Sequence, residues 1–128
     1  MKLLITGTRN GCTILEDWLD YFVRTHGQPN PLIAGGARGV DTQAILWALS
    51  RKIPHIIVHA DWEQYGKKAG PIRNQQMIDM INAADWCIAF LTKNSIGTRD
   101  CLNRAIKKKV NVLIVRNNGY YEYVHYCA

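Results

Sequence analysis

Apolar residues occur along this chain in two patterns, which predict alternating strands and helices. Short runs that are almost wholly apolar are typical of buried strands, and they lie at 2–6, 32–34, 55–59, 86–91 and 110–115. Between these runs, apolar residues recur three and four positions apart, as on one face of a helix. This spacing predicts helices at about 12–25, 40–52, 71–83 and 98–109, with residues 60–70 as the longest loop.

That alternation predicts the fold class. Strands that are apolar throughout and separated by helices form a parallel sheet that is covered on both faces. We therefore expect an α/β domain over residues 1–115, with a three-layer, doubly wound, mostly parallel five-stranded sheet of the Rossmann-like type. Residues 116–128 are rich in tyrosine, and we expect them to be an aromatic C-terminal tail of the same domain.

The segment Gly35–Asp41 (Gly-Gly-Ala-Arg-Gly-Val-Asp) is the strongest candidate for a functional turn. It lies where a predicted strand ends and a predicted helix begins. Glycines permit a tight turn and the close approach of a ligand to backbone amides, and a helix N-terminus favours an anion. Arg38 adds a planar set of donors that matches phosphate or carboxylate. A plain strand-to-helix turn with a surface arginine is the alternative interpretation.

Three further polar turns have comparable positions, at Gly7–Arg9, Gly70–Asn74 and Ser95–Thr98. Ligands of doubly wound sheets bind at the carboxyl ends of the strands, near the switch in strand order, so we expect these turns to form one site. The candidate ligand-binding residues are Gly7, Thr8, Arg9, Gly35, Gly36, Arg38, Gly39, Asp41, Asp61, Trp62, Gly70, Arg73, Asn74, Ser95, Gly97 and Thr98.

The most specific of these predictions concerns Arg73. Pro71 fits the first turn of a helix, where its missing N–H is no loss, and this places Arg73 in the same turn. A cation there opposes the helix dipole unless an anion compensates it.

Other candidates have structural alternatives. Ser95 and Thr98 could cap the helix that follows them, and Asp41 could stabilise the start of its own helix. Asp61 and Trp62 could cap and stack on a sugar or a base, or they could only anchor a packed loop.

The charge of the chain favours an anionic partner. The 128 residues have a net charge of +6, with ten basic and four acidic side chains in residues 67–128 and six of each in residues 1–66. A basic half is typical of proteins that bind phosphorylated small molecules or nucleic acid. Lys107–Lys109 are better explained as cations that complement the end of a helix.

No cofactor or metal site is expected. The cysteines show no metal-ligand spacing, and buried free thiols are their better interpretation. His55 and His59 are four residues apart, but they lie at the ends of a predicted strand rather than on a helix. The chain has no apolar run of ~18 residues, and the first residues are too soon interrupted for a signal peptide. We therefore expect a cytoplasmic protein without a membrane-spanning segment.

Four segments together resemble one known family: Met1–Gly7, Gly35–Asp41, Ala60–Lys67 and Gly70–Asn74. They are similar to the YspA/YpsA-related branch of the SLOG superfamily over about residues 1–115. This is the Rossmann-like group that includes DprA/SMF proteins and the LOG phosphoribohydrolases. The resemblance implies a nucleotide or nucleotide-derived ligand at the strand ends, such as an NAD- or ADP-ribose-related signalling molecule.

One segment departs from the pattern that the resemblance implies for LOG enzymes, Pro-Gly-Gly-x-Gly-Thr-x-x-Glu. Gly97 and Thr98 are retained, but Cys101 stands at the position of the catalytic glutamate. Asp100 is one residue away, which on a helix is a rotation of about 100°. Glycoside cleavage needs a carboxylate aimed at the anomeric carbon. The candidate catalytic residues of an enzyme would be Asp41, Asp61 and Asp100.

Three functions are compatible with these residues. The leading hypothesis is a homodimer or higher homo-oligomer that senses or sequesters a small nucleotide-derived ligand without turning it over. The first alternative is a nucleotide N-glycosidase of the LOG type. The second is single-stranded nucleic-acid binding as in DprA, through the basic half and the tyrosines of the tail, although such tyrosines more often pack on a neighbouring surface or a dimer partner.

Overall fold

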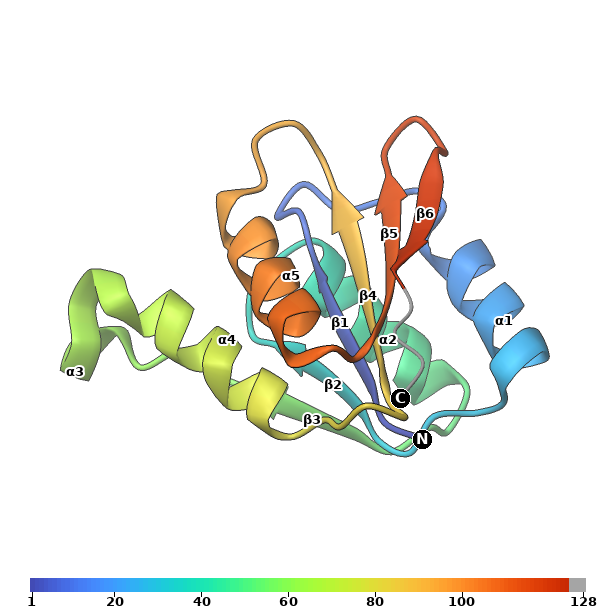
Figure 1. The fold of residues 1–128 in the computed structure, drawn as a ribbon, viewed down its shortest axis with the longest axis horizontal. Coiled ribbons are helices and arrows are strands. Elements are labelled where there is room, and N and C mark those ends of the chain that lie inside the picture. The colour runs from blue at the N-terminus through green and yellow to red at the C-terminus, as the bar shows by residue number, and fades with distance from the viewer. Residues whose placement is uncertain (125–128) are drawn as a thin grey trace.

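The computed structural model describes residues 1–124, which form a sheet with helices on both faces (Figure 1). The strands are β1 (Leu3–Gly7), β2 (Leu32–Gly35), β3 (His55–Val58), β4 (Trp86–Leu91), β5 (Asn111–Arg116) and β6 (Tyr121–Val124). The helices are α1 (Leu15–His26), α2 (Val40–Ser50), α3 (Trp62–Tyr65), the short 3-10 helix η1 (Gly66–Lys68), α4 (Ala69–Asp79) and α5 (Ile96–Lys108).

The order of the strands brings two turns to the same edge of the sheet. The order is β3-β2-β1-β4-β5-β6, and every pair is parallel except β5 and β6. The chain proceeds from β1 outward to β3 and then crosses to β4 on the other side of β1, so the strand order switches between β1 and β4. Leu3 pairs with Trp86 and Gly7 pairs with Phe90. The segments that follow these two strands therefore start level with each other.

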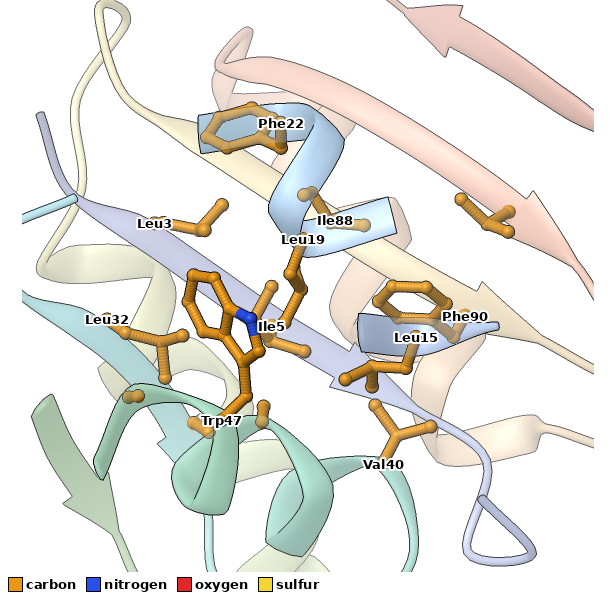
Figure 2. Packing of buried hydrophobic residues seen from close by; sticks show 14 of the residues in the cluster. Leu3, Ile5, Leu15, Leu19, Phe22, Leu32, Val40, Trp47, Ile88 and Phe90 are labelled. Atoms are coloured by element: carbon orange, nitrogen blue, oxygen red, sulfur yellow. The ribbon is translucent and has the colours of Figure 1, made fainter. Parts of the chain in front are cut away.

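Two cores hold the three layers together. Because successive side chains of a strand point to opposite faces, β1 contributes to both cores. Leu3 and Ile5 pack beneath α1 and α2, where Trp47 and Phe22 are among the largest buried side chains (Figure 2). Leu4 packs on the other face, beneath α4 and α5. The α/β class and the mostly parallel, Rossmann-like sheet are thereby confirmed.

The sheet has one strand more than the five predicted, because part of the aromatic tail pairs with β5. Tyr121–Val124 form β6, antiparallel to β5. The hairpin turn contains Asn118 and Gly119, and Gly119 has φ 88°, a conformation that favours glycine. Tyr121 and Tyr123 contact rings of the main body instead of extending from it. Tyr126 and Cys127 lie outside the described residues.

The segment 60–70, predicted as a loop, contains α3, η1 and the start of α4. Because α4 begins at Ala69, Pro71 is its third residue, where the missing N–H still costs nothing since the first turn has no intrahelical acceptors. Arg73 consequently lies in the second turn of α4. The prediction that it lies in the first turn is wrong, and Arg73 therefore does not lie among the unpaired N–H groups at the start of α4.

The other predicted elements differ only at their ends, with α1 beginning at Leu15 rather than residue 12 and α5 at Ile96 rather than residue 98. Within residues 1–124, no helix has the length and apolar character needed to cross a membrane.

Candidate functional site

A cavity of about 400 Å³ opens at the carboxyl ends of β1 and β4. Its walls come from the end of β1 and the turn after it, the β2–α2 turn, the second turn of α4 and the β4–α5 turn. The lining residues are Thr6, Gly7, Thr8, Arg9, Asn10, Ala37, Asp41, Arg73, Asn74, Thr92, Asn94, Ser95, Ile96, Gly97 and Thr98.

A second hollow of about 550 Å³ adjoins this cavity on the side of α3. Arg9, Ala37 and Arg73 line both hollows. The remaining lining of the second hollow is Gly36, Arg38, His59, Ala60 and Trp62. We call the two together the carboxyl-edge cleft.

Most of the predicted site residues line this cleft, and four of the ligand-binding candidates do not. Gly35 and Gly39 belong to the segment 35–41 but do not line the cleft. Asp61 caps α3 by accepting a hydrogen bond from the backbone N–H of Gln64 at 3.1 Å, and Gly70 lies on α4 beside the Trp62 ring. The lining residues that the sequence analysis missed are Thr6, Asn10, Ala37, His59, Ala60, Thr92, Asn94 and Ile96.

Gly39 joins the β2–α2 turn to the β1–α1 turn. It has φ 80°, and a Cβ atom at this position would overlap the backbone of Thr8 and Arg9. The first amide of α2, on Val40, donates to the carbonyl oxygen of Thr8 at 3.1 Å. Only glycine permits this approach, so the packing of the two turns is sufficient to explain the glycine at position 39.

Gly35 and Gly36 allow polar side chains to lie over the same turn. A Cβ atom on Gly35 would overlap the guanidinium group of Arg73 and meet the Asp41 carboxylate at 2.8 Å. A Cβ atom on Gly36 would overlap the His59 ring. The absence of side chains at these two glycines thus brings charged groups from α2 and α4 to one wall of the cleft.

Asp41 is a buried carboxylate in that wall. Its side chain accepts a hydrogen bond from the backbone N–H of Ala37 at 3.2 Å and is only 6% exposed. Burial raises the pKa of Asp41 to about 6, although the Ala37 amide and the charges of Arg73 and Arg9 act in the opposite direction. Asp41 therefore titrates close to neutral pH, unlike an ordinary aspartate.

The arginines of the cleft have no carboxylate partner in the described part of the chain. Arg73 Nε donates to Asn74 Oδ1 at 3.1 Å, and among residues 1–124 no acceptor pairs with its two terminal nitrogens. The ion pairs in the same part of the chain all use other arginines. Arg9, Arg38 and Arg73 thus line the cleft with no carboxylate of residues 1–124 within ion-pair distance.

The start of α5 also lacks a side-chain cap. Ser95 occupies the N-cap position, but its hydroxyl accepts a hydrogen bond from the backbone N–H of Thr92 at 3.0 Å and contacts Thr92 Oγ1 at 2.8 Å. Simple capping by Ser95 is therefore not observed. Gly97 and Thr98 line the cleft in the first turn of α5. The N–H of Ile96 donates to the carbonyl oxygen of Asn94 at 3.1 Å, while the N–H groups of Gly97 and Thr98 have no acceptor among residues 1–124 and suit an anion.

The other candidate carboxylate on this side, Asp100, lies outside the cleft. Burial acts to raise its pKa, but hydrogen bonds from Arg104 at 2.9 Å and Asn74 at 3.0 Å, together with the Arg104 charge, outweigh burial and lower the pKa. Cys101 is fully buried, and burial raises the pKa of its thiol to about 12. Of the three catalytic candidates, only Asp41 lines the cleft.

The described residues contain no group of three or more histidine, cysteine, aspartate or glutamate side chains that could hold a metal ion.

Comparisons with known proteins agree with this geometry. The profile of the family described as "YspA, cpYpsA-related SLOG family" (YAcAr) matches residues 1–65. The chain belongs to this SLOG family. The matched region contains two turns of the cleft, Gly7–Arg9 and Gly35–Asp41, while Gly70–Asn74 and Ser95–Thr98 lie beyond it. The family expected from the sequence motifs is therefore confirmed.

A curated relative extends the similarity over most of the chain. The "Gene 61 protein" of Mycobacterium phage D29 is 38% identical over 120 residues, which cover 88% of this chain and 94% of that protein. No solved structure matches the chain.

Proposed function

We propose that the carboxyl-edge cleft binds a small phosphorylated ligand of the nucleotide or ADP-ribose type, and that the protein senses or sequesters this ligand. The observation that carries the proposal is the set of three arginines that line the cleft and have no carboxylate partner among residues 1–124. Leaving guanidinium groups without an anion forgoes charge-assisted hydrogen bonds, and a phosphate would supply them.

Two neighbouring features support the same ligand class. The uncapped start of α5 offers backbone N–H groups beside the arginines, which is the arrangement that binds phosphate in many α/β domains. Trp62 is about half exposed and lines the adjoining hollow, where its ring offers a stacking surface for a base. The cleft thus has one part suited to phosphate and one suited to a planar group.

Binding without turnover is favoured by the carboxylates. Asp61 and Asp100 are held by other partners outside the cleft, and the buried Cys101 stands where the LOG enzymes have glutamate. A hydrolase would have to use Asp41, and the raised pKa of that residue is the one observation that favours such an enzyme, since a general acid needs a proton near neutral pH.

Calorimetric titration with AMP, ADP, ADP-ribose and NAD tests the proposal. We expect saturable heat with at least one of these ligands and no release of free base on prolonged incubation, followed by chromatography. Absence of heat with every member of the panel would contradict the binding proposal. Release of base that is lost in Asp41→Asn would establish the hydrolase instead.

Single-stranded nucleic-acid binding has weaker support. Tyr121 and Tyr123 pack against Trp18 and Trp86 rather than lining the cleft with the arginines. If this function exists, affinity for an oligonucleotide should fall steeply with salt.

Self-association and a cytoplasmic location belong to the same proposal. β3 is an edge strand with Ile56 and Ile57 partly exposed, and α2 exposes Leu46 and Leu49. A two-fold axis would pair β3 with its own copy in antiparallel fashion and cover these side chains, which sedimentation would detect as a dimer.

The free, buried thiols of Cys12, Cys87 and Cys101 support a reducing compartment.

A further inference from the structure

A third hollow, which shares no lining residue with the carboxyl-edge cleft, lies between α1 and β6. These two elements are neighbours at one side of the molecule (Figure 1), and Trp18 contacts Tyr121 across the gap with 4.9 Å between ring centroids. The hollow measures about 390 Å³, and its lining is four aromatic side chains and one acid: Asp17, Trp18, Tyr21, Tyr121 and Tyr123. We call it the aromatic box. None of its residues lines the cleft.

Two of the three ring pairs in the box are nearly perpendicular, and the third, Trp18 with Tyr121, has an interplanar angle of 62°. Trp18 and Tyr21 make an interplanar angle of 88°, and Tyr121 and Tyr123 make one of 85°. Edge-to-face contacts use the edge of one ring and leave other faces free. Rings at right angles can therefore present faces to a shared space from more than one side, and each face carries negative electrostatic potential that attracts a cation.

The phenol groups also lie near one another. Burial is the main reason that the pKa of Tyr123 is raised, and the proximity of Tyr21 and Tyr121 raises it further. The raised pKa of Tyr123 favours its neutral phenol, so this ring meets the hollow without phenolate charge.

The acidic residue of the box has no partner among the described residues. Asp17 has no hydrogen bond or ion pair within residues 1–124, and neither has Glu16 beside it. By contrast, the nearby carboxylates Asp20 and Glu122 are neutralised by arginines at 2.9 and 3.6 Å. Asp17 thus gives the box one negative charge, in a chain whose net charge is +6.

No cation of the described chain occupies the box. The guanidinium–ring contact found within residues 1–124 is that of Arg51 with Trp47, at 5.5 Å from the ring centroid, on the neighbouring helix α2. The aromatic faces and Asp17 therefore lack the positive partner for which their chemistry is suited.

We propose that the aromatic box binds an organic cation of the quaternary ammonium type. A methylated ammonium group is weakly hydrated and needs no hydrogen-bond acceptors, so ring faces can replace its water at little cost. The same headgroup occurs on free choline-like molecules and on methylated lysine side chains. The box is independent of the carboxyl-edge cleft, and the proposal does not rest on the function proposed for that cleft.

Titration with tetramethylammonium and choline, followed by NMR or calorimetry, tests this proposal. The matched control is 3,3-dimethylbutan-1-ol, which has the shape of choline with a carbon atom in place of the charged nitrogen. We expect millimolar binding of the cations and binding of the neutral alcohol that is at least about tenfold weaker. Equal binding of the alcohol, or no saturable binding of either cation, would overturn the proposal.

A trimethyllysine peptide distinguishes the two sources of the headgroup. Tighter binding of this peptide than of choline would indicate a modified protein partner, while the reverse would indicate a small molecule. Both results support the site.

Variants locate the binding. Tyr121→Ala should weaken choline affinity by roughly five- to tenfold, whereas Tyr121→Phe should retain it because the ring face remains. Asp17→Asn changes an exposed position of α1 and should weaken choline affinity about threefold. This variant tests the site even if Tyr121→Ala does not fold.

Tyr120→Ala is the matched control, since Tyr120 is the more exposed neighbour in the same hairpin and does not line the box. If this control weakens binding as much as Tyr121→Ala, the box is not the site. A dimer in sedimentation that Tyr121→Ala dissociates, without any cation binding, would identify the face as a self-interface and also overturn the proposal.

Discussion

An arginine and an aspartate occur together in two places beside α4. They form an ion pair in one of these places and do not in the other. In the seam between α4 and α5, Arg104 and Asp100 form an ion pair at 2.9 Å, and the net effect of their surroundings lowers the pKa of Asp100. In the carboxyl-edge cleft, no carboxylate of the described chain lies within ion-pair distance of Arg73, and burial raises the pKa of Asp41. Asn74 connects the cleft with the seam, because its side chain accepts a hydrogen bond from Arg73 and donates one to Asp100.

The difference separates a stabilising role from a binding role. Charges that a fold uses for its own stability find partners within it, as in the seam. Charges left without partners at a concave surface forgo that stabilisation, and an anionic ligand is the partner that the cleft would accommodate. Each of the following predictions alters one side of this comparison.

The largest effect should come from the backbone of the cleft. Gly39→Ala forces a Cβ atom against the Thr8–Arg9 backbone at φ 80°, so we expect the free energy of unfolding to fall by about 2–4 kcal/mol. The control Gly97→Ala lies in open space at the start of α5 and should keep or raise the stability, by at most about 1 kcal/mol. Urea denaturation measures both, and a fully stable Gly39→Ala would refute the packing of these turns.

Next in size is the loss of the cleft arginine. Arg73→Ala should weaken ADP-ribose binding by about 1.5–3 kcal/mol, the scale of a charged hydrogen bond, and leave folding nearly unchanged. Arg73→Lys should restore only part of the affinity, because lysine lacks the bidentate geometry. Calorimetry combined with thermal unfolding separates the outcomes. An unfolded variant whose folded fraction binds normally would make Arg73 a structural residue.

The two aspartates should have opposite effects on the pH dependence of stability. The folded-state pKa of Asp41 is raised from 3.8 to about 6, so the folded state binds the proton more tightly and stability falls as the pH rises between these values. Asp41→Asn should remove this fall and raise the free energy of unfolding at pH 7 by about 1–2 kcal/mol. Asparagine can still accept the Ala37 hydrogen bond.

Asp100→Asn is the matched comparison for this measurement. Its folded-state pKa is lowered, so the carboxylate contributes stability above its unfolded pKa, and that contribution is lost as the pH falls through the folded pKa. The substitution should therefore reduce stability at pH 7. Denaturation curves between pH 3 and pH 8 give both signs, and a gain of stability in Asp100→Asn would contradict the comparison.

The smallest effect should come from the arginine of the seam. Arg104→Ala removes a partly exposed ion pair, which is worth about 0.3–1 kcal/mol of stability. It should not change the affinity for ADP-ribose, because Arg104 does not line the cleft. A loss of affinity as large as that of Arg73→Ala would mean that the two arginines do not differ in role.

The sequence was sufficient to predict the parts of the fold that depend on apolar pattern. The run 86–91 coincides with β4, and strand–helix alternation predicted the layers and the edge at which the turns meet. Asn118–Gly119 is a strong hairpin signal that would have predicted β6, but the exposed tyrosines after it gave no buried alternation. A sequence pattern detects a strand through burial, and the strand at this edge is mostly exposed.

The exact start of α4 could not be predicted from Pro71. Proline is tolerated at each of the first positions of a helix, because none of their N–H groups has an intrahelical acceptor. Arg73 was therefore assigned to the wrong turn, although it does line the cleft. The hydrogen-bond partners of Asp61 and Asp100 could not be predicted from the sequence either. Gln64, Asn74 and Arg104 reach these carboxylates only because of how α3, α4 and α5 form and pack.

The location of bound ligand tests the central claim most directly. ¹H–¹⁵N spectra of the wild-type protein, recorded during titration with ADP-ribose, should show the largest shift changes in three segments of the cleft. These are the amides of 7–10, 36–41 and 94–98, with little change along the outer face of α5. Changes that cluster on α5 and β6 instead, or that stay absent at saturating ligand, would contradict the assignment of the cleft as the binding site.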